Sequence, residues 1–140
     1  MCFCPTLFIT CMDHVLGRMS DKSGCGVAFE TVWITDLDFA DDAVTFVETT
    51  EILAGTLDLL SAEAKPLGLR VSWVKTKVQA FGDILDATVE LIPVNAGNVG
   101  VTQTFTYLSS VIHSSTSCNP NVNRRLGRAW SAMNSMDEGV

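Results

Sequence analysis

Two adjacent aspartates between strand-forming segments constrain the fold of this chain more than any other feature. Asp41 and Asp42 are preceded by the segment 32–35 (Val-Trp-Ile-Thr) and followed by 43–47 (Ala-Val-Thr-Phe-Val). Side chains alternate between faces along a strand, so neighbouring carboxylates diverge unless a turn intervenes. At a separation of roughly 5 Å and an effective dielectric near 20, their repulsion would be about 3 kcal/mol. The pattern predicts a β-hairpin with both charges at its tip, where a divalent metal would relieve the repulsion.

The composition is that of one globular domain. The chain has 140 residues, of which 47% are hydrophobic and 18% charged. Its net charge of −7 argues against a free-standing nucleic-acid binder, because affinity for phosphate comes mainly from Lys and Arg. Five cysteines without a Cys-x-x-Cys pair argue against zinc and against a disulfide framework, and they indicate reduced thiols in an intracellular protein.

The segment 1–12 is apolar enough to suggest a signal peptide, but it lacks a cationic start. It contains Pro5, ends before Asp13, and is too short to span a bilayer. We therefore expect no membrane association and interpret this segment as part of a core helix. A chain that opens inside a core is expected to be a fragment of a longer protein.

Hydrophobic periodicity predicts the order of the remaining elements. Thr49 or Thr50 can cap the second helix, and Gly68 can supply its left-handed exit. The predicted elements are a helix over 5–19, a turn-rich link over 20–26, the hairpin, a helix from 49 or 50 to 65, a strand over 69–73, a return strand over 78–81, a strand over 88–94, a turn over 95–100, a strand or hairpin over 105–111, and a helix over 119–136. This order predicts an α+β fold in which a small antiparallel sheet carries helices on one face.

Several motifs then become recognisable in one order. The box Phe39-Ala40-Asp41-Asp42 resembles the aromatic-x-Asp-Asp box of reverse transcriptases, specifically those of LINE-type retrotransposons without long terminal repeats. The segments similar to that family's other motifs are 5–8 for the template-contacting motif, 68–72 with 75–77 for the next palm motif, 105–110 for the primer grip, and 124–129 for the basic helix that follows. The resemblance implies an incomplete polymerase palm over 1–112 and a basic helix over 113–140 that begins the thumb or a connector.

The resemblance also assigns roles to the two aspartates. Asp41 would be the main ligand from this box for two catalytic Mg²⁺ ions, and Asp42 a secondary one. The ions would activate the primer 3′ hydroxyl and neutralise the leaving pyrophosphate. The alternative is that both are ordinary turn residues. Asp36 and Asp38 share one strand face, and we expect them to be solvated.

Other roles follow in the same way, each with a structural alternative. Lys75 would lie near the phosphates of the incoming nucleotide as a proton donor, or would be a solvent-facing lysine at a strand end. Tyr107 and Leu108 would hold the primer terminus, or would pack within a sheet. The basic residues Arg124, Arg125 and Arg128 have the helical spacing for phosphate contacts, or would form a solvated helix face.

The resemblance is incomplete in two respects. The family needs a further aspartate on a strand upstream of the template-contacting motif, and it needs the fingers and most of the thumb, none of which is found in this sequence. Ser109 stands where the primer grip usually has glycine, which would cost on the order of 1 kcal/mol if the turn requires a left-handed backbone.

The expected function is therefore that of a fragment of an RNA-directed DNA polymerase. Its partners would be an RNA template, a DNA primer and a dNTP, and it would act in the nucleus. The isolated chain would be inactive. The alternative is a non-catalytic globular remnant or a repurposed interaction protein. A third possibility, a palm-related cyclase, is disfavoured because the glycine-rich signatures of those enzymes do not occur.

Overall fold

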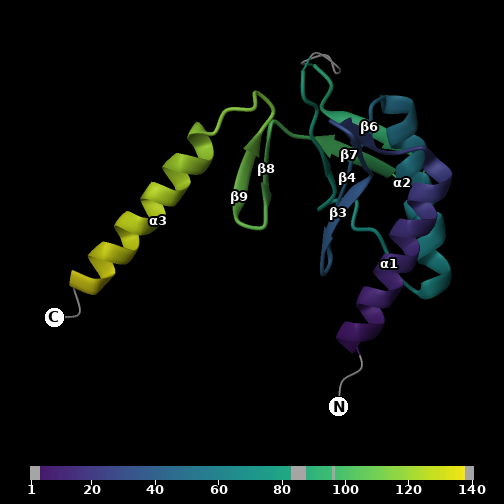
Figure 1. Cartoon of the computed structure of the whole chain (residues 1–140), viewed down its shortest axis with the longest axis horizontal. Helices are drawn as coiled ribbons and strands as arrows, with labels where there is room; N and C mark the ends of the chain where they lie inside the picture. The colour runs from purple at the N-terminus through teal and green to yellow at the C-terminus, as the bar shows by residue number, and fades with distance from the viewer. Residues whose placement is uncertain (1–3, 83–87, 96, 138–140) are drawn as a thin grey trace. The chain divides into compact units, whose positions relative to one another are not determined.

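The computed structural model describes residues 4–82, 88–95 and 97–137, and within these ranges the fold is α+β (Figure 1). The described part contains three α-helices, one short 3₁₀ helix and four small sheets. The elements in chain order are α1 (Cys4–Ser23), β1 (Val27–Phe29), β2 (Val32–Ile34), β3 (Asp36–Phe39), β4 (Asp42–Thr45), α2 (Thr50–Ala64), η1 (Lys65–Leu67), β5 (Lys77–Val78), β6 (Leu91–Val94), β7 (Gly97–Val101), β8 (Thr104–Tyr107), β9 (Ser110–His113) and α3 (Asn119–Asp137).

These elements form two compact units. The first comprises residues 1–76 and 91–99, and the second comprises 77–90 and 100–140, so that the boundary runs through β7. The last helix therefore shares a unit with the β8–β9 hairpin. The expected division into 1–112 and 113–140 rests on motifs alone and stays a prediction.

The core of the first unit lies where α1 and α2 run side by side (Figure 1). Leu16, Met19 and Cys25 are its buried centre, with exposures of 3%, 0% and 2%. Half-buried apolar residues pack against this centre: Met12, Val47, Ile52, Leu59 and Leu60. The apolar spacing along both helices explains why these faces meet. Both helices were predicted from that spacing, and both are confirmed.

The helix ends follow from local chemistry. Thr49 caps α2, because its side-chain oxygen accepts a hydrogen bond from the Ile52 backbone N–H at 3.3 Å. Gly68 ends the following 3₁₀ turn with a left-handed φ of 73°. The first helix runs beyond the predicted end at Met19 as far as Ser23, where Gly24, with φ of 67°, stops it. The Ser20–Gly26 segment is thus partly helical, which corrects the predicted link.

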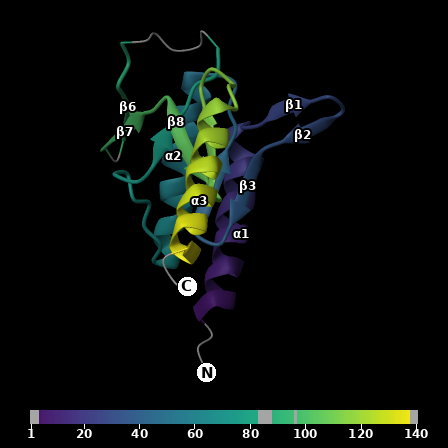
Figure 2. The same cartoon turned by 90° about the vertical axis from the view of Figure 1, so that its left-hand side faces the viewer.

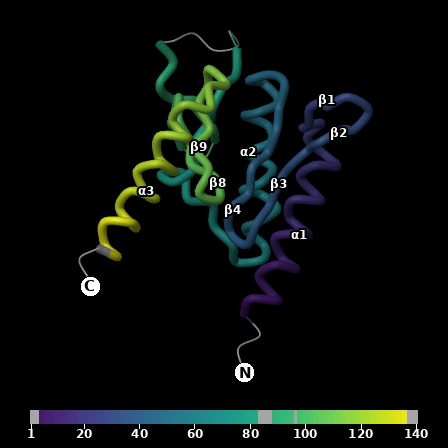
Figure 3. The backbone as a smooth tube through the Cα atoms, turned by 60° about the vertical axis from the view of Figure 1, so that its left-hand side comes forward, coloured from purple at the N-terminus to yellow at the C-terminus, as the bar shows by residue number. Residues whose placement is uncertain are grey.

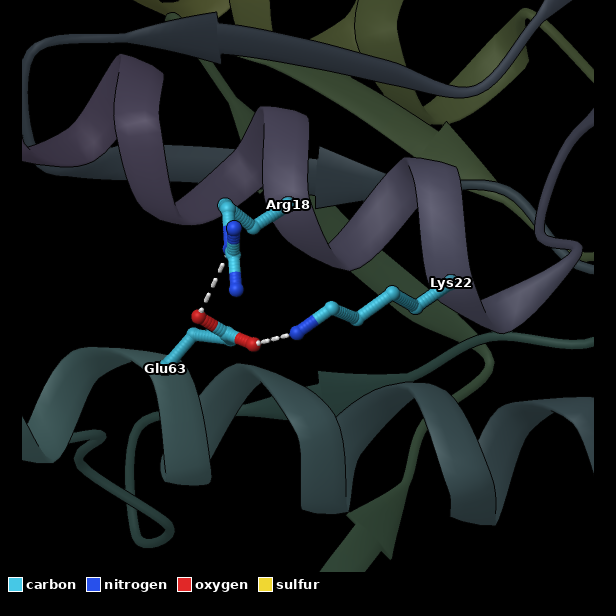
Figure 4. A network of polar contacts seen from close by, with 3 residues as sticks. All are labelled: Arg18, Lys22 and Glu63. Carbon is cyan, nitrogen blue, oxygen red and sulfur yellow. Dashed lines mark hydrogen bonds and ion pairs between the residues drawn. The ribbon is translucent and has the colours of Figure 1, made fainter.

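One carboxylate links the two helices of this unit. Glu63 on α2 accepts hydrogen bonds from Lys22 Nζ and from Arg18 Nε, the latter at 3.2 Å, and both cations lie on α1 (Figure 4). The hydrogen bond from Lys22, followed by the contact with Arg18, holds the pKa of the Glu63 carboxyl below its ordinary value of 4.5.

This lowered pKa predicts a pH-dependent stability. The charged form of Glu63 stabilises the folded unit fully above pH 4.5, and the contribution is lost as the pH falls through the lowered folded-state pKa. We expect Glu63→Gln to be less stable than the wild type at neutral pH, with the difference shrinking in acid. Urea unfolding midpoints of both proteins, measured from neutral pH to below pH 4.5, test this prediction. The exposed loop variant Glu48→Gln is the control, and an unchanging Glu63→Gln difference would contradict the prediction.

The strands around the two aspartates pair differently from the prediction. The segment 32–35 was expected to be the strand that leads into the aspartate turn. Instead, Val32–Ile34 pairs antiparallel with the preceding strand Val27–Phe29, and the strand that leads into the turn is Asp36–Phe39. The β1–β2 ribbon projects from the unit (Figure 2). Trp33 anchors the base of this ribbon. Its indole Nε1 donates a hydrogen bond to the Cys25 carbonyl at 3.3 Å, and the same atom lies only 2.2 Å from where a Cβ on Gly26 would be. Only glycine allows this approach.

Four segments in and before the third sheet differ from the prediction. The order of this sheet is β5-β7-β6, with β5 parallel to β7. Residues 69–73, predicted as a strand, form none, and the return strand over 78–81 is reduced to Lys77–Val78. The predicted turn over 95–100 is mostly strand β7, because Gly97–Val101 gains backbone partners in the sheet that outweigh its turn-like composition. The predicted strand over 88–94 is confirmed only at Leu91–Val94, and residues 83–87 lie outside the described range.

In the second unit, the predicted β8–β9 hairpin and the last helix α3 are both present (Figure 3). Gln79 ties the segment after β5 to this hairpin, because its side-chain amide donates to the carbonyls of Gln103 at 2.9 Å and Ile112 at 3.0 Å. Asn121 Oδ1 accepts from the Val111 backbone N–H at 3.4 Å and so holds the first turns of α3 against β9.

Candidate catalytic turn and basic helix

The aspartate pair lies at the tip of the β3–β4 hairpin. Phe39 pairs with Asp42, so Ala40 and Asp41 are the two central residues of the turn. Ala40 has a φ of 56°, and a positive φ at the first central position alone is typical of a type II′ turn. Asp41 and Asp42 are both exposed. The predicted hairpin tip is therefore confirmed, with one carboxylate in the turn and the next at the first position of β4.

The strand register determines what surrounds Asp42. Leu37, Phe39, Asp42 and Val44 share one face of the two-stranded ribbon, because Leu37 pairs with Val44 and Phe39 with Asp42. Phe39 is 62% exposed and Leu37 is 47% exposed. Asp42 thus lies at the end of an exposed apolar face. Few neighbouring polar side chains on that face would compete with Asp42 for a charged ligand.

Asp36 and Asp38 lie on the opposite face of the ribbon. Asp38 is exposed as expected, but Asp36 is half-buried, and its Oδ1 accepts from Thr35 Oγ1 at 2.5 Å and from Ser20 Oγ at 3.2 Å. The expectation that both are solvated is therefore corrected for Asp36, because α1 packs a hydroxyl against it.

An open hollow of about 270 Å³ lies beside this opposite face. It is lined by four carboxylates and four other residues: Asp13, Leu16, Gly17, Ser20, Asp21, Thr35, Asp36 and Asp38. Sequence reasoning missed this arrangement, although Asp13, Gly17 and Asp21 recur every fourth residue on one face of α1. Nowhere in the described ranges do three or more His, Cys, Asp or Glu side chains converge closely enough to hold a metal ion. The candidate site at the turn offers two carboxylates, Asp41 and Asp42.

Lys75 lies in a turn rather than at a strand end. Its backbone N–H donates to the Ser72 carbonyl at 3.1 Å, and the neighbouring Thr76 N–H donates to the same carbonyl at 2.9 Å. The Lys75 side chain is exposed. Its predicted role near nucleotide phosphates stays a prediction.

The primer-grip segment and the basic helix meet in the second unit. Leu108 and Ser109, with φ of 45° and 70°, are the central residues of the β8–β9 turn, the pattern of a type I′ turn. Arg124 Nη1 donates to the Ser109 carbonyl at 2.6 Å. Tyr107, opposite Ser110, is half-buried, and Leu108 is 49% exposed. The structure thus brings together three of the predicted nucleic-acid contacts: Tyr107, Leu108 and Arg124.

The three arginines have different surroundings. Arg124 is half-buried and is held by the Ser109 carbonyl, whereas Arg125 and Arg128 are exposed. A sequence pattern could identify the cluster, but not that Arg124 also has a structural contact, because that contact depends on where the hairpin turn lies against the helix.

The positive φ of Ser109 indicates that glycine at this position would stabilise the chain. Ser109→Gly should raise the free energy of unfolding by about 1 kcal/mol, because glycine adopts positive φ without the Cβ clash and keeps the carbonyl that Arg124 binds. The matched control is Ser110→Gly in strand β9, which should lower stability by about 0.5–1 kcal/mol. Denaturant unfolding measures both, and equal shifts of the two variants would show that the turn is not strained.

No protein-family model, no curated protein and no solved structure matches this chain. Among the residues that the structure describes, no helix combines the length and the apolar character needed to cross a membrane. The fold and the candidate site thus define an α+β chain. One hairpin turn carries a pair of carboxylates, and a second hairpin turn is bound by an arginine of the last helix.

Proposed function

We propose that this chain is part of the palm of an RNA-directed DNA polymerase of a non-LTR retrotransposon. The observation that carries the proposal is the two-residue turn at Ala40-Asp41, which places Asp41 and Asp42 at the exposed end of a hairpin. The order of the motif-like segments supports it. The palm itself, the polymerase activity and the nucleic-acid partners are parts of this proposal.

The proposal assigns a separate task to the residues of each unit. Asp41 and Asp42 would hold Mg²⁺, which binds one or two protein carboxylates together with phosphate oxygens, and when bound the metal would stabilise the charge that develops during nucleotidyl transfer. Arg125 and Arg128 are exposed and would contact backbone phosphates. Arg124 would hold the Leu108–Ser109 turn in position through the Ser109 carbonyl.

The isolated chain is expected not to polymerise DNA. By resemblance the mechanism uses three carboxylates, and the turn offers two, so the positioning on which phosphoryl transfer depends is incomplete. Primer extension on a poly-A template with Mg²⁺ should show no incorporation above a buffer control. Incorporation that Asp41→Ala abolishes would contradict this expectation.

The proposal itself is tested by nucleotide binding rather than by turnover. A fluorescent dNTP titrated with the full chain should bind in the presence of Mg²⁺ and lose that binding when EDTA removes the metal. Binding that is the same with and without Mg²⁺, or no binding at millimolar nucleotide, would remove the support for a polymerase-derived site.

The second candidate is a non-catalytic interaction protein. It is favoured by the large apolar side chains that α3 exposes, because exposed apolar surface of this extent marks contacts with other molecules. A chain that fails the nucleotide test but binds a macromolecular partner through α3 would belong to this class.

A further inference from the structure

The connection between β9 and α3 holds a serine against a histidine. His113 is the last residue of β9, and Ser115 follows it in the link that leads to α3 (Figure 1). The Oγ of Ser115 lies 2.7 Å from Nδ1 of His113. The histidine is half-buried, whereas the serine is exposed and therefore open to a reagent from solution. A hydroxyl at this distance from an imidazole nitrogen has the geometry of a nucleophile beside its base.

A backbone hydrogen bond determines which ring nitrogen of His113 carries the proton. The Ser115 backbone N–H donates to the same Nδ1 atom at 3.1 Å. An N–H group donates only to a nitrogen with a free lone pair, so the neutral ring carries its proton on Nε2. The Ser115 hydroxyl must then be the donor in its own contact with Nδ1. Its proton therefore points at the atom that would receive it when the oxygen reacts.

The backbone around this pair is fixed on both sides. The Thr116 N–H donates to the His113 carbonyl at 2.9 Å and closes a turn with Ser114 and Ser115 at its centre. The Thr116 hydroxyl donates to the Ser115 carbonyl at 2.6 Å. Before the turn, His113 is paired with Thr104 in the β8–β9 hairpin. The hydroxyl and the imidazole are thus held together before any reaction, which lowers the entropic part of a barrier.

We propose that Ser115 is a nucleophile activated by His113, and that it accepts an acyl group from an activated ester. Serine alone is a weak nucleophile, and an adjacent base that takes its proton activates it. The Ser115 Oγ attacks the carbonyl carbon of the ester, and its proton passes to Nδ1 of His113 as the Oγ–C bond forms. The bond from that carbon to the aryloxide breaks, the aryloxide leaves with the bonding electron pair, and His113 releases its proton to water.

This inference is independent of the proposed polymerase ancestry. Neither the aspartate turn nor the arginines of α3 take part in the reaction, so a chain that binds no nucleotide could still be acylated at Ser115. The two proposals therefore fail or succeed in separate experiments.

Acetylation by p-nitrophenyl acetate, located by peptide mass spectrometry, tests the nucleophile in the full chain. The acetyl group should appear on Ser115 at least about tenfold faster than on Ser131, an exposed serine on α3 of the same unit. His113→Phe keeps an aromatic ring in β9 but removes both nitrogens, so it should slow the acetylation of Ser115 at least about tenfold. Equal rates at the two serines, or a Ser115 rate that His113→Phe leaves unchanged, would overturn the inference.

A second measurement does not depend on whether His113→Phe disturbs β9. A fluorophosphonate reacts by the same route, because Oγ attacks phosphorus, fluoride leaves and the proton passes to Nδ1. Intact-protein mass spectrometry should show the adduct on the wild type and on Ser131→Ala but not on Ser115→Ala, which removes only an exposed hydroxyl. A wild type without the adduct, or Ser115→Ala labelled as strongly as the wild type, would show that Ser115 is not an activated nucleophile.

Discussion

Leu16→Ala is expected to lower the free energy of unfolding of the first unit by about 2–5 kcal/mol. Leu16 is 3% exposed and packs with Met19 and Cys25 at the centre of the contact between α1 and α2. Removing its Cγ and two methyl groups loses their burial and leaves a cavity in a small core. A unit of this size has a stability of about 5–10 kcal/mol, so the loss is a large part of the total.

The same helix offers a matched control for this prediction. Leu7 also lies on α1 but is 63% exposed, so Leu7→Ala should change the stability by no more than about 0.5 kcal/mol. Urea unfolding followed by the fluorescence of Trp33 and Trp73, both in the first unit, compares the two variants. Equal midpoints for Leu16→Ala and Leu7→Ala would show that the core is not where the structure places it.

Asp41→Asn is expected to weaken Mg²⁺-dependent dNTP binding at least tenfold, about 1.4 kcal/mol. The substitution keeps the size and the turn-forming character of the side chain but removes one of two charges at the hairpin tip. A hard cation such as Mg²⁺ loses a full anionic ligand, and the remaining carboxylate on Asp42 cannot replace it.

The control for this prediction lies on the same hairpin. Asp38→Asn removes the same charge from the opposite face of the ribbon, so it should leave binding within about twofold of the wild type. If Asp38→Asn weakens binding as much as Asp41→Asn does, the loss reflects the overall negative charge of the hairpin and not a metal site at the turn.

Local sequence signals predicted the features that depend on local chemistry. The apolar periodicity of 5–19 and 119–136, the cap at Thr49 and the left-handed Gly68 each involve residues close together in the chain, and the structure bears them out. The tip at Asp41 was predicted for the same reason. The α+β class is likewise confirmed, but the single small antiparallel sheet is not, because the described strands form four small sheets, one of which contains a parallel pair.

The pairing of short strands could not be predicted in this way. Val32–Ile34 has the composition to pair on either side, and the choice of Val27–Phe29 depends on how Trp33 packs over Gly26. Gly97–Val101 has the composition of a turn, and it forms a strand only because other strands of the folded sheet supply its hydrogen-bond partners. Strands of three to five residues carry too little periodicity to decide these pairings.

The same distinction divides the candidate site. Asp41, Asp42 and the arginine cluster were visible as residue types in a recognisable order. The contact of Arg124 with the Ser109 carbonyl and the hydrogen bonds of Asp36 to Ser20 and Thr35 were not, because each joins side chains to groups whose positions only the folded chain defines.

Paramagnetic broadening by Mn²⁺, a substitute for Mg²⁺, measures most directly where the chain binds a divalent ion. In backbone amide spectra of the full chain with dNTP present, we expect sub-stoichiometric Mn²⁺ to broaden residues 39–44 first, and Asp41→Asn to abolish that selectivity. Broadening that begins instead around Asp13, Asp21 and Asp36, or that spreads evenly over the acidic surface, would contradict a metal site at the hairpin tip.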